Sequence, residues 1–207
     1  MKYIYEFIGT FFLVFTVGMT VLEPNGAGIL APLAIGSVLA VMVFAGGHVS
    51  GAHYNPAVSL AVFLRGKLSS RDLGIYWAVQ MVAGLIAGFL TIYYKGYPAQ
   101  TALPFETTKA FLAEFLFTFA LCFVVLNAAF CKGTKGNSYF GWAIGFTVLV
   151  GAYAVGAISG AAFNPAVAFG ITIMKLSVWS NLWIFFAANF LGGVCAAWVF
   201  KGVDSKA

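Results

Sequence analysis

Long apolar stretches, separated by short polar turns, follow one another along the whole chain. Six of them reach the length of about 20 residues that a helix needs to cross the hydrocarbon core of a bilayer. They lie at roughly residues 3–22, 31–47, 72–94, 109–130, 139–158 and 178–200. Clusters of Gly, Pro, Asn and Lys follow several of these stretches, and such clusters form turns. The pattern predicts an all-α membrane protein with six transmembrane helices.

Two further apolar stretches, at about 56–64 and 165–174, are too short to cross the membrane. A helix of roughly ten residues is about 15 Å long, which is half of the hydrocarbon thickness of about 30 Å. Both stretches belong to nearly the same motif: GHVSGAHYNPAV at 47–58 and GAISGAAFNPAV at 156–167 share eight of twelve residues. We therefore expect two re-entrant half-helices.

The duplicated motif is part of a longer internal repeat. Asn55 and Asn164 are 109 residues apart, and the same offset brings Gln80 onto Asn189. We expect a single domain over residues 1–207, made of a first repeat at 1–105 and a second at 106–207. Each repeat holds three spans, an odd number, so the second repeat must be inverted relative to the first. Inverted repeats place their sites near the membrane midplane, where the halves meet.

The Asn-Pro step, which in isolation would indicate only a turn, suits the start of a half-helix. Asn is a favoured N-cap because its side-chain oxygen accepts a free backbone N–H, and Pro is favoured at the first helical position. Asn55 and Asn164 would begin the half-helices and leave their amide NH₂ groups free to meet a permeating molecule. Two helix N-termini that converge at the midplane each carry about half a positive charge, which repels cations.

Composition agrees with this interpretation and excludes other classes. Hydrophobic residues make up 62% of the chain and charged residues 8%, against about 25% charged residues in soluble domains. The net charge of +5 does not indicate nucleic-acid binding, because the basic residues border apolar stretches, where anionic lipid headgroups attract them. The cysteines lack metal-ligand spacing, and no nucleophile–base pair is recognisable. We expect no enzyme, no metal site and no cofactor.

Lys and Arg also set the expected orientation. With both termini in the cytoplasm, eight of the 11 basic residues lie inside, and Lys95, Lys109 and Lys175 lie outside. The sequence has no N-x-[ST] glycosylation acceptor, and its loops and tails are short. These features favour a multi-pass protein of a prokaryotic cytoplasmic membrane.

Taken together, the six spans, the two half-spans and both Asn-Pro-Ala (NPA) motifs resemble the aquaporins, the major intrinsic protein family. The resemblance covers essentially the whole chain and includes SGAHYNPAV and an early Glu in each half. It implies the aquaporin fold, a homotetramer in the lipid bilayer with one pore per subunit, and passive passage of water or small uncharged solutes, with protons excluded. The pore centre would be formed by the motif residues Asn55, Pro56, Ala57, Asn164, Pro165 and Ala166.

The resemblance also implies roles for two carboxylates and two histidines. Glu6 and Glu114 would each brace a re-entrant loop, which suits membrane-embedded carboxylates that need backbone N–H partners. The family pattern places His at both positions 48 and 53, so that His48 and His53 would lie at the cytoplasmic vestibule. Taken alone, each histidine is also compatible with a structural, hydrogen-bonded role.

The family has a narrower extracellular filter of four positions, and counting from the motifs assigns Ile35, Ala152, Ala161 and Val167 to it. Strict water channels typically hold an aromatic residue, His, a small residue and Arg there, whereas all four residues here are aliphatic. Val after the second motif resembles some plant tonoplast intrinsic proteins. The departure predicts a wider, more apolar mouth that conducts water and also small neutral solutes such as ammonia, urea or hydrogen peroxide.

Three other functions stay open on the sequence alone. A facilitator of glycerol, urea or ammonia would pass water as a secondary permeant. An ion-coupled transporter can also use an inverted repeat, but it needs carboxylates in the substrate path, and the matched placement of Glu6 and Glu114 suits bracing better. Two intact motifs and a filter of small residues argue against a structural junction protein with a blocked pore.

Overall fold

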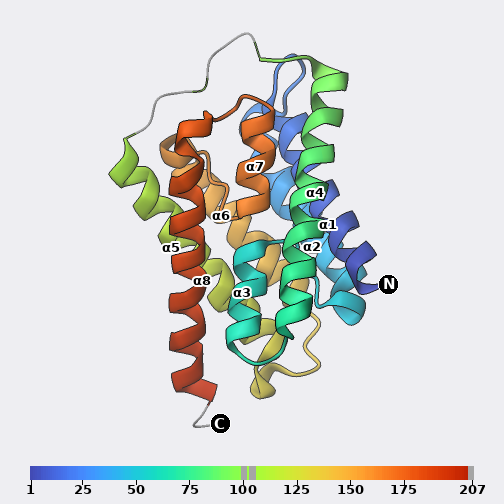
Figure 1. The fold of residues 1–207 in the computed structure, drawn as a ribbon, viewed down its shortest axis with the longest axis vertical. Coiled ribbons are helices and arrows are strands. Elements are labelled where there is room, and N and C mark those ends of the chain that lie inside the picture. The colour runs from blue at the N-terminus through green and yellow to red at the C-terminus, as the bar shows by residue number, and fades with distance from the viewer. Residues whose placement is uncertain (99–101, 103–105, 205–207) are drawn as a thin grey trace.

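The structure is a computed structural model that describes residues 1–98, 102 and 106–204. The described part is built from helices, and six segments are long and apolar enough to cross a membrane (Figure 1). The α-helices in these segments are α1 (Lys2–Val21), α2 (Ala31–Ser50), α4 (Ser70–Lys95), α5 (Thr107–Val125), α6 (Phe140–Ser159) and α8 (Leu182–Asp204). The prediction of six transmembrane helices is confirmed.

The two half-helices are α3 (Pro56–Leu64) and α7 (Pro165–Ile173), of nine residues each. Figure 1 shows them in the middle of the molecule, α7 in the upper part and α3 in the lower part. Each begins as the motif predicts, with an Asn of extended backbone whose side chain caps the helix. Asn55 Oδ1 accepts from the N–H of Ala57 at 2.8 Å, and Asn164 Oδ1 accepts from the N–H of Ala166 at 2.9 Å. The predicted inverted repeat with two re-entrant half-helices is therefore the fold of this chain.

The long helices pack in pairs that recur in the two halves. α1 lies along α4 in the first half, and α5 lies along α8 in the second. α2 and α6 join the halves, and glycines make this contact close: a Cβ on Gly36 would lie 2.8 Å from the carbonyl oxygen of Gly145. Small residues at such positions let two helix backbones approach each other in a membrane.

Each half-helix packs against a long helix of the other half. α3 contacts α8, where a Cβ on Gly193 would lie 2.8 Å from the carbonyl oxygen of Ala57. α7 contacts α4, where a Cβ on Gly84 would lie 2.7 Å from the carbonyl oxygen of Ala166. The offset of 109 residues relates the two contacts, so the two halves repeat even the single glycine-to-carbonyl contacts between half-helix and long helix.

Short helical turns complete the chain. The 3₁₀ turns are η1 (Gly28–Leu30), η3 (Lys132–Thr134) and η4 (Trp179–Asn181). The last turn of the fourth span, η2 (Leu126–Phe130), is instead a π-helix that continues α5 without a break. The boundary expected between the two repeats, after residue 105, falls on residues outside the described part.

Candidate functional site

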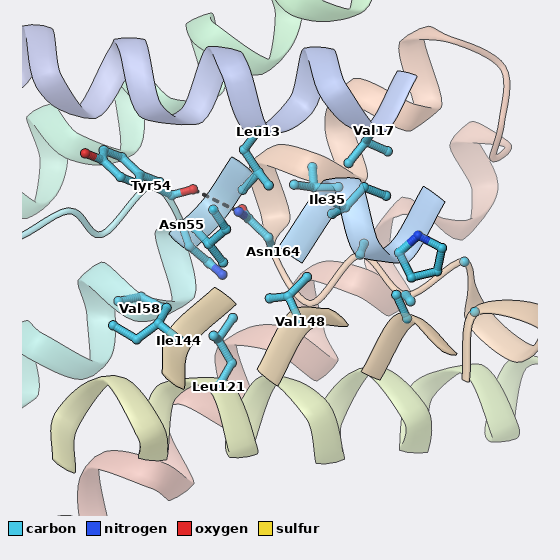
Figure 2. A pocket seen from close by; sticks show the side chains of 18 of the residues that line it. Leu13, Val17, Ile35, Tyr54, Asn55, Val58, Leu121, Ile144, Val148 and Asn164 are labelled. Atoms are coloured by element: carbon cyan, nitrogen blue, oxygen red, sulfur yellow. Dashed lines mark hydrogen bonds between the residues drawn. The ribbon is translucent and has the colours of Figure 1, made fainter. Parts of the chain in front are cut away.

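The two motif asparagines meet at the centre of the molecule and hold each other's loops. Asn55 Nδ2 donates to the carbonyl oxygen of Phe163 at 2.8 Å, and Asn164 Nδ2 donates to the carbonyl oxygen of Tyr54 at 2.8 Å. Figure 2 shows the second of these bonds beside the cavity described below. The sequence predicted free amide groups, but one N–H of each amide is engaged across the halves. One N–H per amide is left to meet a permeating molecule.

The loops that lead into the half-helices have an unusual backbone. Ala52 and Tyr54 have φ values of 51° and 49°, and the equivalent Ala161 and Phe163 have φ values of 52° and 48°. A left-handed conformation costs an L-residue roughly 1–2 kcal/mol. Four such residues therefore store several kcal/mol, and the surrounding structure must hold them in place. Nothing in the residue types announced this strain, since none of the four is Gly, Asn or Asp.

Glu6 supplies this support in the first half. The side chain is fully buried, and both carboxylate oxygens accept two hydrogen bonds each. Oε1 accepts from Ser50 Oγ at 2.7 Å and from the N–H of His53 at 2.9 Å. Oε2 accepts from the N–H of Tyr54 at 2.7 Å and from Gln80 Nε2 at 2.9 Å. The carboxylate thus connects α1, α2, α4 and the strained loop.

Glu114 repeats this arrangement in the second half. Its Oε1 accepts from Ser159 Oγ at 2.7 Å and from the N–H of Ala162 at 2.9 Å. Its Oε2 accepts from the N–H of Phe163 at 2.7 Å and from Asn189 Nδ2 at 2.9 Å. Four donors satisfy both oxygens, which offsets much of the cost of burying a carboxylate. The sequence predicts the loop contacts, whereas the bonds from Gln80 and Asn189 to the two carboxylates are found only in the structure.

The two histidines have different environments. His53 lines the cavity, is 5% exposed, and its Nδ1 lies 3.1 Å from Ser59 Oγ. His48, in the last turn of α2, is exposed and makes an edge contact with the ring of Tyr5, 6.5 Å between centroids. The residues that line the cavity include His53 but not His48. The structure therefore brings one of the two predicted vestibule histidines to the candidate site.

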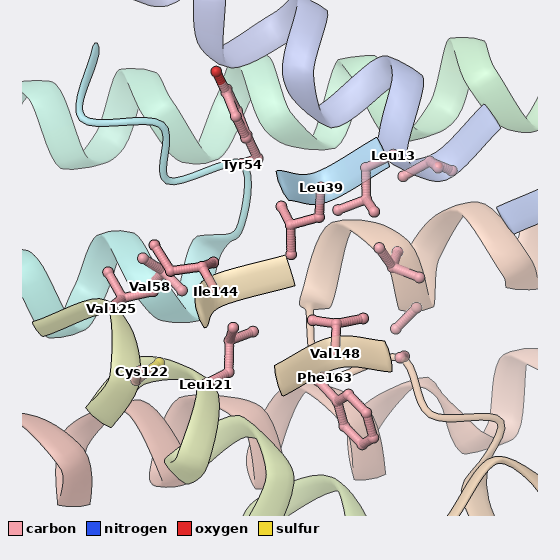
Figure 3. Close-up of a cluster of buried hydrophobic side chains, with 14 of the residues drawn as sticks. Leu13, Leu39, Tyr54, Val58, Leu121, Cys122, Val125, Ile144, Val148 and Phe163 are labelled. Carbon is pink, nitrogen blue, oxygen red and sulfur yellow. The ribbon is translucent and has the colours of Figure 1, made fainter. Parts of the chain in front are cut away.

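A cavity of about 250 Å³ is lined by both asparagines and by residues as far as Val21, the last residue of α1, and Ala31, the first residue of α2. All four residues assigned to the filter line it: Ile35, Ala152, Ala161 and Val167. The rest of the wall is mostly aliphatic, and Figures 2 and 3 show several of these side chains directed towards the cavity and the buried cluster beside it. Those that the motifs did not indicate include Leu13, Leu39, Leu121, Ile144 and Val148. Only the packing of their helices brings them together.

The electrostatics of the site come from the backbone. The N-termini of α3 and α7 converge at Asn55 and Asn164, and each N-terminus carries roughly half a positive charge. Among the residues that line the cavity, none is Asp, Glu, Lys or Arg. Polar groups are concentrated near the asparagine pair, while the wall is apolar. This arrangement offers hydrogen bonds to a neutral molecule and no counter-charge to a cation.

Known proteins share this sequence and architecture. The Major intrinsic protein family profile matches residues 1–200. Glycerol uptake facilitator protein-like 6 of Lactiplantibacillus plantarum is 33% identical over 67% of this chain and 67% of its own length. Aquaporin NIP3-1 of Arabidopsis thaliana is 32% identical over 96% of this chain and 66% of its own length. Aquaporin Z of Brucella melitensis is 30% identical over 96% of this chain and 95% of its own length.

A solved structure agrees at the level of the fold. The X-ray structure of the aquaglyceroporin from Plasmodium falciparum matches with a TM-score of 0.81 at 21% identity, covering 96% of this chain and 94% of that chain. The family match covers nearly the whole sequence. Members of the family are channels rather than enzymes. The chain belongs to the major intrinsic protein family and is a multi-pass membrane channel for water, small solutes or both.

Proposed function

We propose that this chain forms a passive channel that conducts water and also passes small neutral solutes. The observation that carries the proposal is the aliphatic lining at Ile35, Ala152, Ala161 and Val167. Such side chains neither donate hydrogen bonds nor add charge, so they neither bind water selectively nor repel a neutral solute. A permeant finds its donors at Asn55 and Asn164, where one N–H of each amide is available to an oxygen acceptor.

We also assign the exclusion of cations and protons to the paired half-helix N-termini. Two partial positive charges in a water-poor interior raise the energy of a cation far more than they would in bulk water. Glu6 and Glu114 cannot relieve this barrier, because four hydrogen bonds occupy each carboxylate away from the permeation path. Because hydrogen bonds occupy both carboxylates, ion-coupled transport is disfavoured: it needs a carboxylate that a permeating ion can reach.

A solute panel in proteoliposomes tests the proposal. Stopped-flow light scattering should give faster shrinkage with protein than without it for water, urea and ammonia, with flux linear in the gradient. Val167→Arg should lower the urea-to-water permeability ratio by narrowing the mouth, and Val167→Leu should separate added size from added charge. Wild-type protein that passes water but no other solute, or an unchanged ratio in Val167→Arg, contradicts the assignment.

A solute facilitator with water as a secondary permeant is the second candidate. The aliphatic cavity favours it, because an apolar wall can contact the carbon skeleton of a polyol while the asparagine pair binds its hydroxyl groups. One similar protein is also named a glycerol uptake facilitator-like protein. Glycerol permeability that exceeds water permeability in the same vesicles would favour this candidate, whereas slow glycerol flux would favour the first.

We further propose a homotetramer in a prokaryotic cytoplasmic membrane, with both termini in the cytoplasm. The uneven distribution of Lys and Arg supports the orientation. Large apolar side chains that are exposed on one copy, such as Trp142 and Phe146, support contact with lipid or with further copies. Native mass spectrometry in detergent tests the assembly. Protease digestion of a C-terminal tag in intact and in lysed spheroplasts tests the orientation.

A further inference from the structure

The loop between α1 and α2, residues 22–30, lies next to one end of the cavity. Val21 precedes this loop, Ala31 and Pro32 follow it, and all three line the cavity. Figure 1 shows the loop (blue) at the upper end of the molecule, beside the end of α4 (green). We call residues 22–30 the mouth loop.

Lys95, the last residue of α4, holds the first part of the mouth loop. Its Nζ donates to the carbonyl oxygens of Leu22 at 2.7 Å, Pro24 at 2.9 Å and Asn25 at 3.1 Å. An ammonium group has three N–H donors, so these carbonyl groups use all of them. Hydrogen bonds from a charged donor are roughly twice as strong as neutral ones. Lys95 therefore ties the loop firmly to the end of α4.

Tyr153, on α6, holds the other end of the mouth loop. Its hydroxyl donates to the carbonyl oxygen of Ile29 at 2.8 Å. Tyr153 directly follows the filter residue Ala152 in the sequence, so the loop is tied to the part of α6 that contributes to the filter. Two helices from different halves, α4 and α6, thus hold one loop.

The mouth loop leads directly into the turn that carries Ile35. α2 begins at Ala31, and Ile35 lies four residues further on, on the same face of the helix. Both residues line the cavity. The position of the loop therefore sets where the first turn of α2 lies. Ile35 and Ala152 have no hydrogen-bonding side-chain group, so the distance between them depends on contacts outside the filter.

The sequence repeat does not carry either tie to the other half. The offset of 109 residues relates Tyr153 to Phe44, which has no hydroxyl group, and Lys95 to Asp204, which is an acid. The bonds from loop N–H groups to a buried carboxylate, in contrast, occur in both halves. Lys95 and Tyr153 therefore serve this end of the cavity, and not the fold that the two halves share.

We propose that Lys95 is a positioning residue for selectivity: together with Tyr153 it clamps the mouth loop and so holds Ile35 and Ala152 at the spacing that limits the size of a permeating solute. This inference rests on the proposed function as a channel for water and small neutral solutes. Without the clamp, the first turn of α2 moves away from α6 and the mouth widens. The close contact between Gly36 and Gly145 keeps the rest of α2 in place, so the channel itself persists.

The test compares permeability ratios in proteoliposomes. Lys95→Met keeps a side chain of similar length and removes the three donors. It should raise the glycerol-to-water ratio about threefold, which corresponds to a barrier lower by about 0.7 kcal/mol, and it should raise the urea-to-water ratio by less. Water and solute use the same channels, so the ratio does not depend on the amount of active protein. A variant that merely folds less well leaves the ratio unchanged.

Three further variants make the test specific. Lys95→Arg keeps the positive charge and several N–H donors, and it should restore most of the wild-type ratio. Tyr153→Phe removes only the hydroxyl group and should raise the glycerol-to-water ratio as well. Lys109→Met is the matched control, because Lys109 also lies at the end of a span but forms a surface ion pair with Glu106 at 2.9 Å. It should leave both ratios unchanged.

Each outcome decides the clamp separately from the channel function. If the wild-type protein passes water and solutes, and neither Lys95→Met nor Tyr153→Phe raises the ratios, the clamp is wrong while the channel function stands. If Lys109→Met raises them as much as Lys95→Met, the effect comes from lost surface charge and the clamp is again wrong.

The remaining outcomes concern the wild-type permeability. If the wild-type protein passes water alone and Lys95→Met admits urea, the clamp is supported and the proposed solute permeability of the wild-type protein is wrong. If neither the wild-type protein nor any variant passes water, both proposals fail. Tyr153→Phe changes a single hydroxyl group, so it decides the matter should Lys95→Met fail to fold.

Discussion

Replacing Glu114 by Gln exchanges one carboxylate oxygen for an NH₂ group, so the side chain can no longer accept hydrogen bonds at both Oε1 and Oε2. The amide NH₂ must then face either the donors Ser159 and Ala162 or the donors Phe163 and Asn189. In the first orientation the Ser159 hydroxyl can rotate and accept a hydrogen bond from the NH₂ group. The N–H of Ala162 cannot accept one and loses its partner. The second orientation leaves the N–H of Phe163 against another donor.

The expected cost follows from these contacts. An unpaired buried N–H costs about 1–3 kcal/mol, and hydrogen bonds to a charged acceptor are worth about 1 kcal/mol more than neutral ones. Relief of the charge's desolvation offsets part of the second contribution. We expect Glu114→Gln to lower the free energy of unfolding by about 2–4 kcal/mol. The loss acts on the loop that holds Ala161 and Phe163 in left-handed conformations, so water permeability should fall as well.

Glu106→Gln provides the matched control. Glu106 is exposed and forms a surface ion pair with Lys109 at 2.9 Å, and such a pair is worth about 0–1 kcal/mol. Unfolding in detergent, followed by tryptophan fluorescence, would measure both variants, and stopped-flow shrinkage would measure permeability. If Glu114→Gln is no less stable than Glu106→Gln, or is less stable but keeps full water permeability, the carboxylate does not hold the loop in its conducting conformation.

Two further changes address the centre of the molecule. Gly193→Ala should destabilise the protein by about 1–3 kcal/mol, because the new Cβ would lie 2.8 Å from the carbonyl oxygen of Ala57. Gly74→Ala is the control and should be neutral or slightly stabilising, because the space around its Cβ is open. Equal melting temperatures of the two variants would contradict the close contact at Gly193. Asn55→Asp keeps the N-cap but sets a carboxylate oxygen against the carbonyl oxygen of Phe163, so proton leak through the channel should rise. A pH-sensitive dye trapped in proteoliposomes would measure the leak. An unchanged leak would count against the exclusion of protons at the two asparagines.

The membrane explains why so much of the fold follows from the sequence. A span must be long, apolar and helical, so length and hydropathy alone locate six helices and two half-helices. The role of Asn55 as an N-cap is equally local, because it depends on the residue itself and its next two neighbours. Its bond to Phe163 is different. That bond joins loops 108 residues apart, and only the packing of the two halves determines that the amide reaches this carbonyl group.

The histidines and the π-turn show where local pattern is insufficient. His48 and His53 are five residues apart in one motif, yet one is exposed beside Tyr5 and the other lines the cavity. The difference depends on where α2 ends: the helix stops at Ser50, and the chain changes direction at Gly51, which has a φ of 85°. The π-turn that ends at Phe130 lies in an apolar stretch that looks like an ordinary span. Its supporting donors, Thr134 and Asn137, follow in what the sequence shows only as a polar turn.

The way each half-helix packs has a consequence for biogenesis. The chain is synthesised from its N-terminus, so α3 emerges long before α8, the helix against which the Ala57 carbonyl group closes on Gly193. Until then the first half-helix lacks its final neighbour, although Phe163, whose carbonyl oxygen accepts from the Asn55 amide, has already been synthesised. The contact between α3 and α8 is therefore completed last, after the final span has entered the bilayer. A chain that still lacks α8 therefore holds five of the six spans and a first half-helix whose packing is incomplete.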